Sequence, residues 1–129
     1  MPKISEKTAL QTAQNFQVEA SKSGFEWDNI EDLLEKLNEE ILELRCGIEN
    51  KDDSNIEEEL GDILFTATNL VKNLDYDAET VLKKANNKFE RRYNGMFELF
   101  KVHYPHKSSD ELTFEEWDAL WKIQKKTEK

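Results

Sequence analysis

Apolar side chains recur along most of the chain at intervals of three and four residues, the spacing that gathers them on one face of an α-helix. The clearest stretch alternates these intervals over Ile30, Leu34, Leu37, Ile41, Leu44 and Ile48. Similar spacing predicts further helices over residues 6–23, 54–74, 77–100 and 113–123. Short connections favour antiparallel neighbours. The pattern therefore predicts an all-α fold, an antiparallel bundle of four to five helices.

Capping motifs predict where several of these helices begin. In a capping box, a Ser, Thr or Asp is followed three residues later by a Glu whose side chain returns to the first residue's backbone N–H. The pattern occurs at Asp28 with Glu31, at Ser54 with Glu57, and at Thr113 with Glu116. Asp77 predicts the start of the long fourth helix. Residues 103–110, which include the second proline, predict a loop before the last helix.

Composition narrows the class of protein without changing the helical picture. The 129 residues contain no repeat, low-complexity tract or flexible linker, which favours a single domain over residues 1–129. Asp and Glu outnumber Lys and Arg by 28 to 18, and the net charge of −10 argues against nucleic-acid or membrane binding. No apolar run approaches the roughly 20 residues of a membrane span, and the first residues lack a signal-peptide pattern. We therefore expect a cytoplasmic protein.

Two acidic clusters lie on neighbouring predicted helices. Residues 39–43 read EEILE and residues 57–62 read EEELGD. A single Glu on a helix is usually exposed to solvent, which is the simpler interpretation for each of them. At about 100° per residue, however, Glu40 lies roughly 80° from the middle of the apolar face, Glu43 about 140° away on the same side, and Glu39 nearly opposite. Glu40 therefore borders buried surface, with Glu43 one turn above it.

The third predicted helix repeats this three-residue spacing with Glu59 and Asp62, and Phe65 and Asn69 follow on the same face. A phenylalanine there indicates that this side of the helix is covered, and buried acids need partners. Four carboxylates converging from two helices make an oxygen-ligand site for a cation, as helical bundles commonly do. Neither His lies at such a position, which favours Mg²⁺ or Mn²⁺ over iron or zinc.

The spacing of these acids resembles the EExxE and ExxD signature of the MazG-type nucleoside triphosphate pyrophosphohydrolases, members of the all-α NTP pyrophosphatase superfamily. Further stretches match this family in the same order. They are Gly24-Phe25-Glu26-Trp27, EELGDILF at residues 58–65, Asn69-Leu70, KANNKFERRY at residues 84–93, and Trp121 with Lys125. The resemblance covers residues 10–126, nearly the whole chain.

The resemblance implies an all-α fold, usually a dimer, that hydrolyses a nucleoside triphosphate to the monophosphate and pyrophosphate with the support of Mg²⁺. The metal ligands that it implies are Glu40, Glu43, Glu59 and Asp62. Glu39 then lies outside this set or joins it occasionally. Either Glu39 or Glu43 is the candidate general base, and the sequence does not choose between them.

The resemblance also implies which residues contact the substrate. The family's pair of phosphate-contacting basic residues corresponds to Lys88 and Arg92, and its polar positions near the nucleotide correspond to Asn69 and Asn86. Its closing motif corresponds to Trp121, an aromatic residue near the base, and to Lys125. The pattern alone supports a simpler interpretation of each. The cations pair with nearby acids, the asparagines lie on helix surfaces, and the tryptophan packs in the core.

Two classes of function stay open at this point. The first is a Mg²⁺-dependent pyrophosphohydrolase, whose partners are a nucleoside triphosphate and a second copy of the chain. The alternative is a non-catalytic acidic helical module that binds a protein partner or nucleotides. The four acids together with the basic pair favour the enzyme, because an interaction module needs none of these residues in register. The base and the sugar of the substrate stay undefined.

Overall fold

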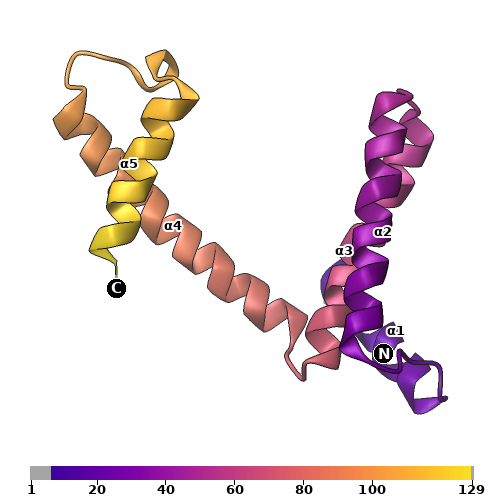
Figure 1. Cartoon of the computed structure of the whole chain (residues 1–129). Coiled ribbons are helices and arrows are strands. Elements are labelled where there is room, and N and C mark those ends of the chain that lie inside the picture. The colour runs from indigo at the N-terminus through magenta and orange to yellow at the C-terminus, as the bar shows by residue number, and fades with distance from the viewer. Residues whose placement is uncertain (1–6, 129) are drawn as a thin grey trace. The chain divides into compact units, whose positions relative to one another are not determined.

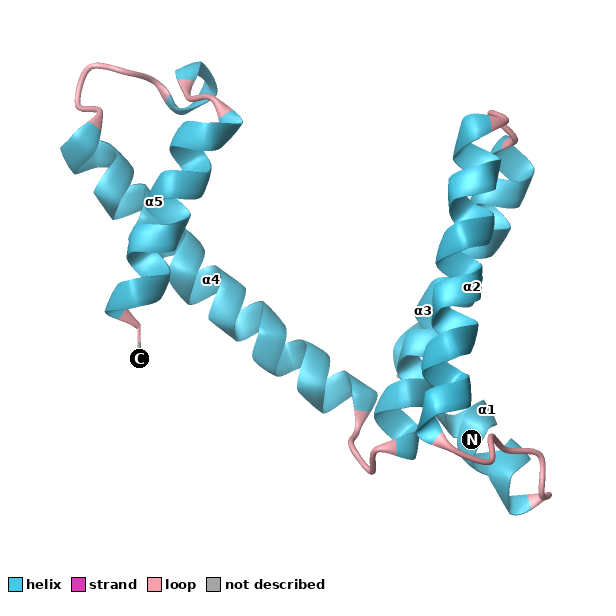
Figure 2. Cartoon of the chain, viewed as in Figure 1, coloured by secondary structure: helices cyan, strands magenta, loops and turns pink. Residues whose placement is uncertain are grey.

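The computed structural model describes residues 7–128, and Figure 2 shows that every regular element among them is helical. Five α-helices and one short 3₁₀ helix follow one another: α1 (Ala9–Lys22), α2 (Ile30–Glu49), α3 (Asp53–Asn73), α4 (Ala78–His103), η2 (Ser109–Glu111) and α5 (Phe114–Thr127). The predicted all-α class is confirmed. The chain divides into two compact units, with the boundary between Val81 and Leu82. Within residues 7–128, no helix combines the length and apolar composition that a membrane crossing requires.

The first unit is built on an antiparallel hairpin of α2 and α3, which lie side by side (Figure 1). Lys51 turns the chain between them in the left-handed region, at φ 53°. Gly47, close to the end of α2, permits a close approach of the two helices. A Cβ atom there would lie 2.9 Å from Asn55 Nδ2 and 3.3 Å from Ile56 Cγ1 on α3. A larger residue at this position would therefore push the helices apart.

The first helix packs against α3 and is shorter than its prediction. It begins after Thr8, whose hydroxyl accepts from the Gln11 N–H at 3.1 Å. The sequence analysis missed this capping box because Gln rather than Glu completes it. Residue 6, where the predicted helix began, lies outside the described residues. The buried Gln17 ties α1 to α3 by donating from Nε2 to the Phe65 carbonyl oxygen at 2.9 Å.

The face of α2 that meets α3 differs from the predicted one. Buried residues recur every seven positions at Leu33, Glu40 and Gly47. Leu34 and Ile41, in the predicted apolar series, stay exposed within the chain. The predicted seam is therefore only partly correct, since Ile30, Leu37 and Leu44 of the series are half-buried. Apolar spacing identifies a face of the helix but not which edge of that face meets the neighbour. As a result, Glu40 is more deeply buried than the sequence indicated.

Two predicted helix starts are displaced. The N-cap of α2, the residue directly before the helix, is Asn29 rather than Asp28. The Asn29 side chain accepts from the Asp32 N–H at 2.9 Å. The N-cap of α3 is Asp52 rather than Ser54. Asn, Asp and Ser cap helices about equally well, so local sequence does not choose between close neighbours of these types. Both predicted caps are therefore wrong by one or two residues.

Two other predicted starts are confirmed. Asp77 Oδ2 accepts from the Thr80 N–H at 3.0 Å at the start of α4. At the start of α5, Thr113 Oγ1 accepts from the Glu116 N–H at 3.1 Å, and Glu116 Oε1 accepts from the Thr113 N–H at 2.9 Å. The bond from Thr113 N–H and nearby Lys107 lower the pKa of Glu116.

The second unit holds most of α4 together with η2 and α5. Its buried core consists of Met96, Phe100, Leu112 and Leu120. Aromatic side chains extend this core, and the ring centroids of Phe97 and Trp117 lie 5.4 Å apart. The predicted loop over residues 103–110 is interrupted by η2, where Glu111 Oε1 accepts from the Ser108 N–H at 2.7 Å. The loop prediction is therefore correct for residues 104–108, because His103 still belongs to α4 and η2 begins at Ser109.

Removing the cap of α5 is expected to destabilise the chain. Thr113→Ala deletes the hydroxyl that accepts from the Glu116 N–H, so the free energy of unfolding should fall by about 1 kcal/mol. Thr113→Ser keeps a hydroxyl and should leave it within about 0.3 kcal/mol. Urea unfolding followed by tryptophan fluorescence measures both. Equal losses in the two variants would argue against the capping role.

Candidate metal centre

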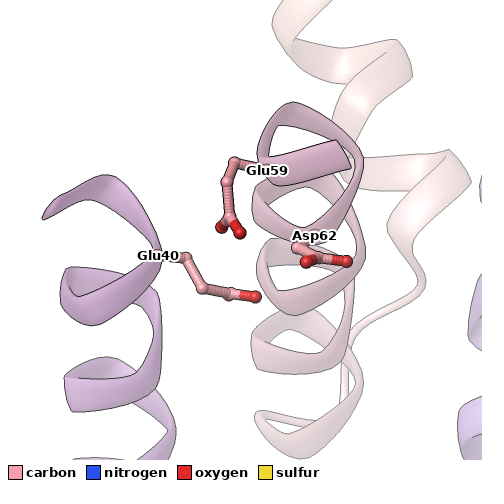
Figure 3. Close-up of side chains that lie close together, drawn as sticks. All are labelled: Glu40, Glu59 and Asp62. Atoms are coloured by element: carbon pink, nitrogen blue, oxygen red, sulfur yellow. The ribbon is translucent and has the colours of Figure 1, made fainter. Parts of the chain in front are cut away.

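Three acidic side chains meet between α2 and α3. One carboxylate oxygen each from Glu40, Glu59 and Asp62 lies within 4.8 Å of the other two. Figure 3 shows Glu40 reaching from α2 toward α3, which carries Glu59 and Asp62. The hairpin thus brings together three of the four residues that the sequence analysis named as metal ligands.

The register of the hairpin explains why these acids meet. On α2, Glu40 follows Leu33 by seven residues on the buried stripe, and on α3, Thr66 follows Glu59 in the same way. Seven residues are close to two helical turns, so each pair lies on one face of its helix. The acids therefore occupy positions that apolar residues would fill in an ordinary helix pair.

Two of the three acids are buried without a neutralising partner. Glu40 and Glu59 are 5% and 7% exposed, whereas Asp62 is exposed. Glu40 Oε1 and Glu59 Oε2 have no hydrogen-bond partner among residues 7–128. A buried carboxylate without a partner is strongly unfavourable, so this arrangement requires a proton or a cation. Oxygen ligands lie about 2.0–2.6 Å from Mg²⁺ or Ca²⁺, so three oxygens spaced as these are fit around one ion.

The raised pKa of Glu59 also indicates that this cluster requires a proton or a cation. Burial raises the pKa of the Glu59 carboxyl, and a hydrogen bond to Glu43 raises it further, as do the charges of Glu43, Asp62 and Glu40. Glu43 therefore lies beside Glu59, although its own side chain is exposed. Glu39 is exposed and is not part of the group of three. A divalent cation would relieve this repulsion while leaving every carboxylate ionised.

A cavity of about 520 Å³ lies in the same unit, between α1, the segment over residues 25–32 and α3, and its volume is typical of small-molecule sites. Its aromatic lining consists of Phe16, Phe25, Trp27 and Phe65. Its polar lining includes Gln17, Glu26, Asn69 and Lys72. Because Phe65 and Asn69 follow Asp62 by three and seven residues, the cavity and the acidic cluster share one face of α3.

The sequence analysis did not predict this cavity, although it expected the face of Phe65 to be covered and named Asn69 as a polar position near the nucleotide. Gln17 and Lys72 were missed because neither belongs to a motif and only tertiary contacts place them. Lys72 Nζ donates to Ser21 Oγ at 2.9 Å and lies 3.9 Å from Glu26 Oε2. The segment over residues 24–27, part of the family resemblance, supplies the signal that could have pointed to the cavity.

The predicted polar contacts fall into both units. Asn69 is half-buried in the cavity lining, where its Oδ1 accepts from Asn73 Nδ2 at 3.0 Å. Asn86, Lys88 and Lys125 belong to the second unit and are exposed. The surface interpretation therefore describes Asn86 correctly and Asn69 only in part.

Arg92 and Trp121 already have partners in the second unit. Arg92 is half-buried and donates from Nε to Glu128 Oε1 at 3.3 Å. Trp121 packs against Phe89, with ring centroids 5.6 Å apart. The simpler interpretations, an ion pair and core packing, are thus realised, and neither is incompatible with contact to a substrate. Glu128 is a partner of Arg92 that the sequence analysis missed.

The first unit thus combines an acidic cluster on a helical hairpin with an aromatic cavity, and helical bundles build metal and ligand sites from side chains on facing helices in this way. A family model described as the MazG nucleotide pyrophosphohydrolase domain matches residues 28–97. The chain belongs to this family, which confirms the resemblance found in the sequence.

Two relatives show how far the similarity extends. The nucleoside triphosphate pyrophosphohydrolase/pyrophosphatase MazG of Thermotoga maritima is 40% identical over 113 residues, which cover 88% of this chain and 42% of the relative. The nucleoside triphosphate pyrophosphohydrolase of Escherichia coli K12 is 40% identical over 87 residues, which cover 66% of this chain and 33% of the relative. The chain therefore spans less than half the length of these curated relatives.

Ionisation of Glu59 is expected to destabilise the metal-free protein. Because the pKa in the folded protein is raised above the ordinary 4.5, protonated Glu59 stabilises the fold below that pH, and this contribution is lost as the pH rises through the raised pKa. Glu59→Gln removes the ionisation, so its free energy of unfolding should rise relative to wild type between pH 4.5 and neutrality.

Urea unfolding in the presence of a chelator, repeated across this pH range, measures the difference. Glu58→Gln is the matched control, because Glu58 is an exposed neighbour on α3. The free energy of unfolding of Glu58→Gln should not rise relative to wild type between pH 4.5 and neutrality, as that of Glu59→Gln should. Parallel pH profiles for wild type and Glu59→Gln would refute the expectation.

Proposed function

We propose that this protein is a Mg²⁺-dependent pyrophosphohydrolase that cleaves a ribo- or deoxyribonucleoside triphosphate to the monophosphate and pyrophosphate. The observation that carries the proposal is the pair of buried carboxylate oxygens without partners, beside a third acid, in a chain of the MazG family. The curated relatives are named for this reaction. The proposed location is the cytoplasm, where nucleoside triphosphates are made and used.

The proposed metal ligands are Glu40, Glu43, Glu59 and Asp62. Their donors are all carboxylate oxygens, which favours Mg²⁺, with Mn²⁺ as the alternative, over zinc. A triphosphate carries about four negative charges, and these acids alone would repel it. Bound Mg²⁺ supplies the compensating positive charge and lowers the pKa of a coordinated water.

A glutamate of α2 is the proposed acceptor of the proton from the attacking water. Glu43 lies beside Glu59, and Glu39 is exposed about one turn earlier on the same helix. If Glu43 uses its oxygens as a ligand, Glu39 is the available base, and the roles exchange if Glu39 completes the ligand set.

Local positive charge in α4 supports phosphate binding. Residues 83–92 hold five cations and one acid, in a chain whose net charge is −10: Lys83, Lys84, Lys88, Arg91 and Arg92 against Glu90. Lys88 and Arg92 are one turn apart, so both can contact one phosphate chain. We assign the phosphate-binding role to this pair.

The aromatic cavity of the first unit is the proposed compartment for the nucleoside. Its aromatic side chains offer stacking surfaces for a base, and Asn69 offers a side-chain N–H beside them. Asn86, Trp121 and Lys125 of the second unit are further proposed contacts to the nucleotide, on the strength of the family motifs that they match.

Removal of one acid from the cluster is expected to abolish the reaction. Glu40→Gln and Asp62→Asn each delete a charge that holds the ion, so kcat/KM for pyrophosphate release should fall about 100-fold or more. A panel of ribo- and deoxyribonucleoside triphosphates, assayed for pyrophosphate with Mg²⁺ and with a chelator, measures the effect. Glu58→Gln, a nearby exposed acid, should retain the wild-type rate.

A wild-type protein that releases no pyrophosphate from any nucleotide of the panel would overturn the enzymatic proposal. The non-catalytic acidic module, which binds a protein partner or nucleotides without cleaving them, would then be the better description of this chain.

Exposed apolar side chains support a homodimer as the proposed assembly. Leu60 and Leu64 on α3 are exposed, Leu64 to 69%, and Leu34 and Ile41 on α2 are exposed as well. At about 100° per residue, Leu60 and Leu64 lie roughly 160° from Asp62, so this face points away from that acid. An isologous contact would bury the same apolar face in both copies.

A charge on this apolar face is expected to dissociate the dimer. Leu64→Lys should convert the dimer to a monomer, since the lysine would have to lose its hydration in the interface. Leu42→Lys is the control, because Leu42 is 61% exposed and lies on the side of α2 opposite Leu33. Sedimentation velocity gives the mass of each. A monomeric wild type, or a dimeric Leu64→Lys, would disprove the assignment.

A further inference from the structure

The end of α5 contacts α4 at Gly95. A Cβ atom at this position would overlap the end of the Gln124 side chain, so this side chain lies directly against the glycine and would have to move if a larger residue stood there. From this site, Gln124 Nε2 donates to Glu128 Oε2 at 2.8 Å. One oxygen of the Glu128 carboxylate is therefore bonded to a side chain that lies against α4.

The other oxygen of Glu128 faces two arginines of α4. Glu128 Oε1 accepts from Arg91 Nε at 2.9 Å and from Arg92 Nε at 3.3 Å. The side chains of Glu128 and Arg92 are only 13% and 19% exposed, whereas that of Arg91 is 59% exposed. The bond to Arg91 is the shorter one, but the bond to Arg92 is better shielded from solvent, and shielding strengthens a charge-assisted hydrogen bond.

The geometry of these bonds leaves much of the Arg92 guanidinium available. A guanidinium carries one N–H at Nε and four on its two terminal nitrogens. Because Glu128 accepts from Nε, the terminal nitrogens keep donors that can bind a phosphate in a bidentate manner. Lys88, one turn earlier on α4, is exposed and has no ion pair among the described residues.

We propose that Glu128 is a positioning residue that holds Arg92 from its Nε side, so that the terminal N–H groups are fixed for a phosphate of the substrate. The inference rests on the proposed function, which assigns Arg92 to phosphate binding. A flexible arginine loses side-chain entropy when it binds, and holding it beforehand removes part of that loss. Arg91 shares the carboxylate, but its greater exposure leaves it outside this role.

Glu128→Ala should raise KM for the triphosphate about 3- to 10-fold, the range expected when one long side chain is no longer held in place. The value of kcat should stay within about twofold, because Arg92 contacts the phosphate before and during the reaction alike. The inhibition constant of inorganic tripolyphosphate should rise by the same factor as KM. Glu98→Ala is the matched control: it removes an exposed glutamate of the same unit that pairs with Lys101 at 3.0 Å, and it should leave both constants unchanged.

The Arg92→Gln background separates a positioning role from a structural one. Here Glu128→Ala should change KM no further, because the carboxylate acts through Arg92. A structural role would weaken binding in both backgrounds. Thermal melting would reveal whether Glu128→Ala folds. If it does not, Glu128→Gln, which keeps the size of the side chain, is used in its place in both backgrounds.

Three results would overturn the positioning role. They are an unchanged KM in Glu128→Ala, an effect that persists in Arg92→Gln, and a fall in KM, which would mean that Glu128 competes with the substrate for Arg92. A wild-type protein that neither releases pyrophosphate nor binds tripolyphosphate would refute the proposed function itself. If the wild type releases pyrophosphate and Arg92→Gln raises KM, any of these three results refutes only the positioning role of Glu128.

Discussion

Repulsion between carboxylates across the α2–α3 hairpin is the constraint on which the rest of the first unit depends. Glu40 and Glu59 occupy buried positions on facing stripes, and each leaves one oxygen without a partner among residues 7–128. The packing around them must hold the helices together against that repulsion. Leu33 is buried on the same stripe of α2, and Gly47 permits close contact with the start of α3. A cation that binds the folded hairpin, as proposed for Mg²⁺, would therefore stabilise the first unit.

Each unit contains a glutamate that is largely shielded from solvent, and the pKa shifts of the two are opposite in direction. Burial and neighbouring acids raise the pKa of Glu59, whereas the Gln124 hydrogen bond, followed by Arg91 and Arg92, lowers the pKa of Glu128. Glu59 therefore requires a proton or a cation, while Glu128 is satisfied by the cations of its own chain. The same residue type lies among other acids in one unit and pairs with arginines in the other, and its neighbours make the difference.

Local motifs were predictable where one residue type has no nearby competitor. The caps at Asp77 and Thr113 were correct because each depends on a single side chain and a backbone N–H three residues ahead. The caps predicted at Asp28 and Ser54 were wrong because Asn29 and Asp52 compete for the same function. The choice between such neighbours depends on where the helix packs, which local spacing does not contain.

The sequence by itself determined the all-α class, the approximate helix boundaries and the acidic residues of the candidate centre, because helical periodicity and capping involve residues at most a few positions apart. Tertiary structure decided the rest. It selected the edge of α2 that meets α3, so that Glu40 became buried, and it formed the cavity from three separate segments. It also joined Glu128 to Arg92 across 36 positions of sequence. Burial and pairing of this kind depend on segments that meet only after folding, and no short-range pattern records which segments those are.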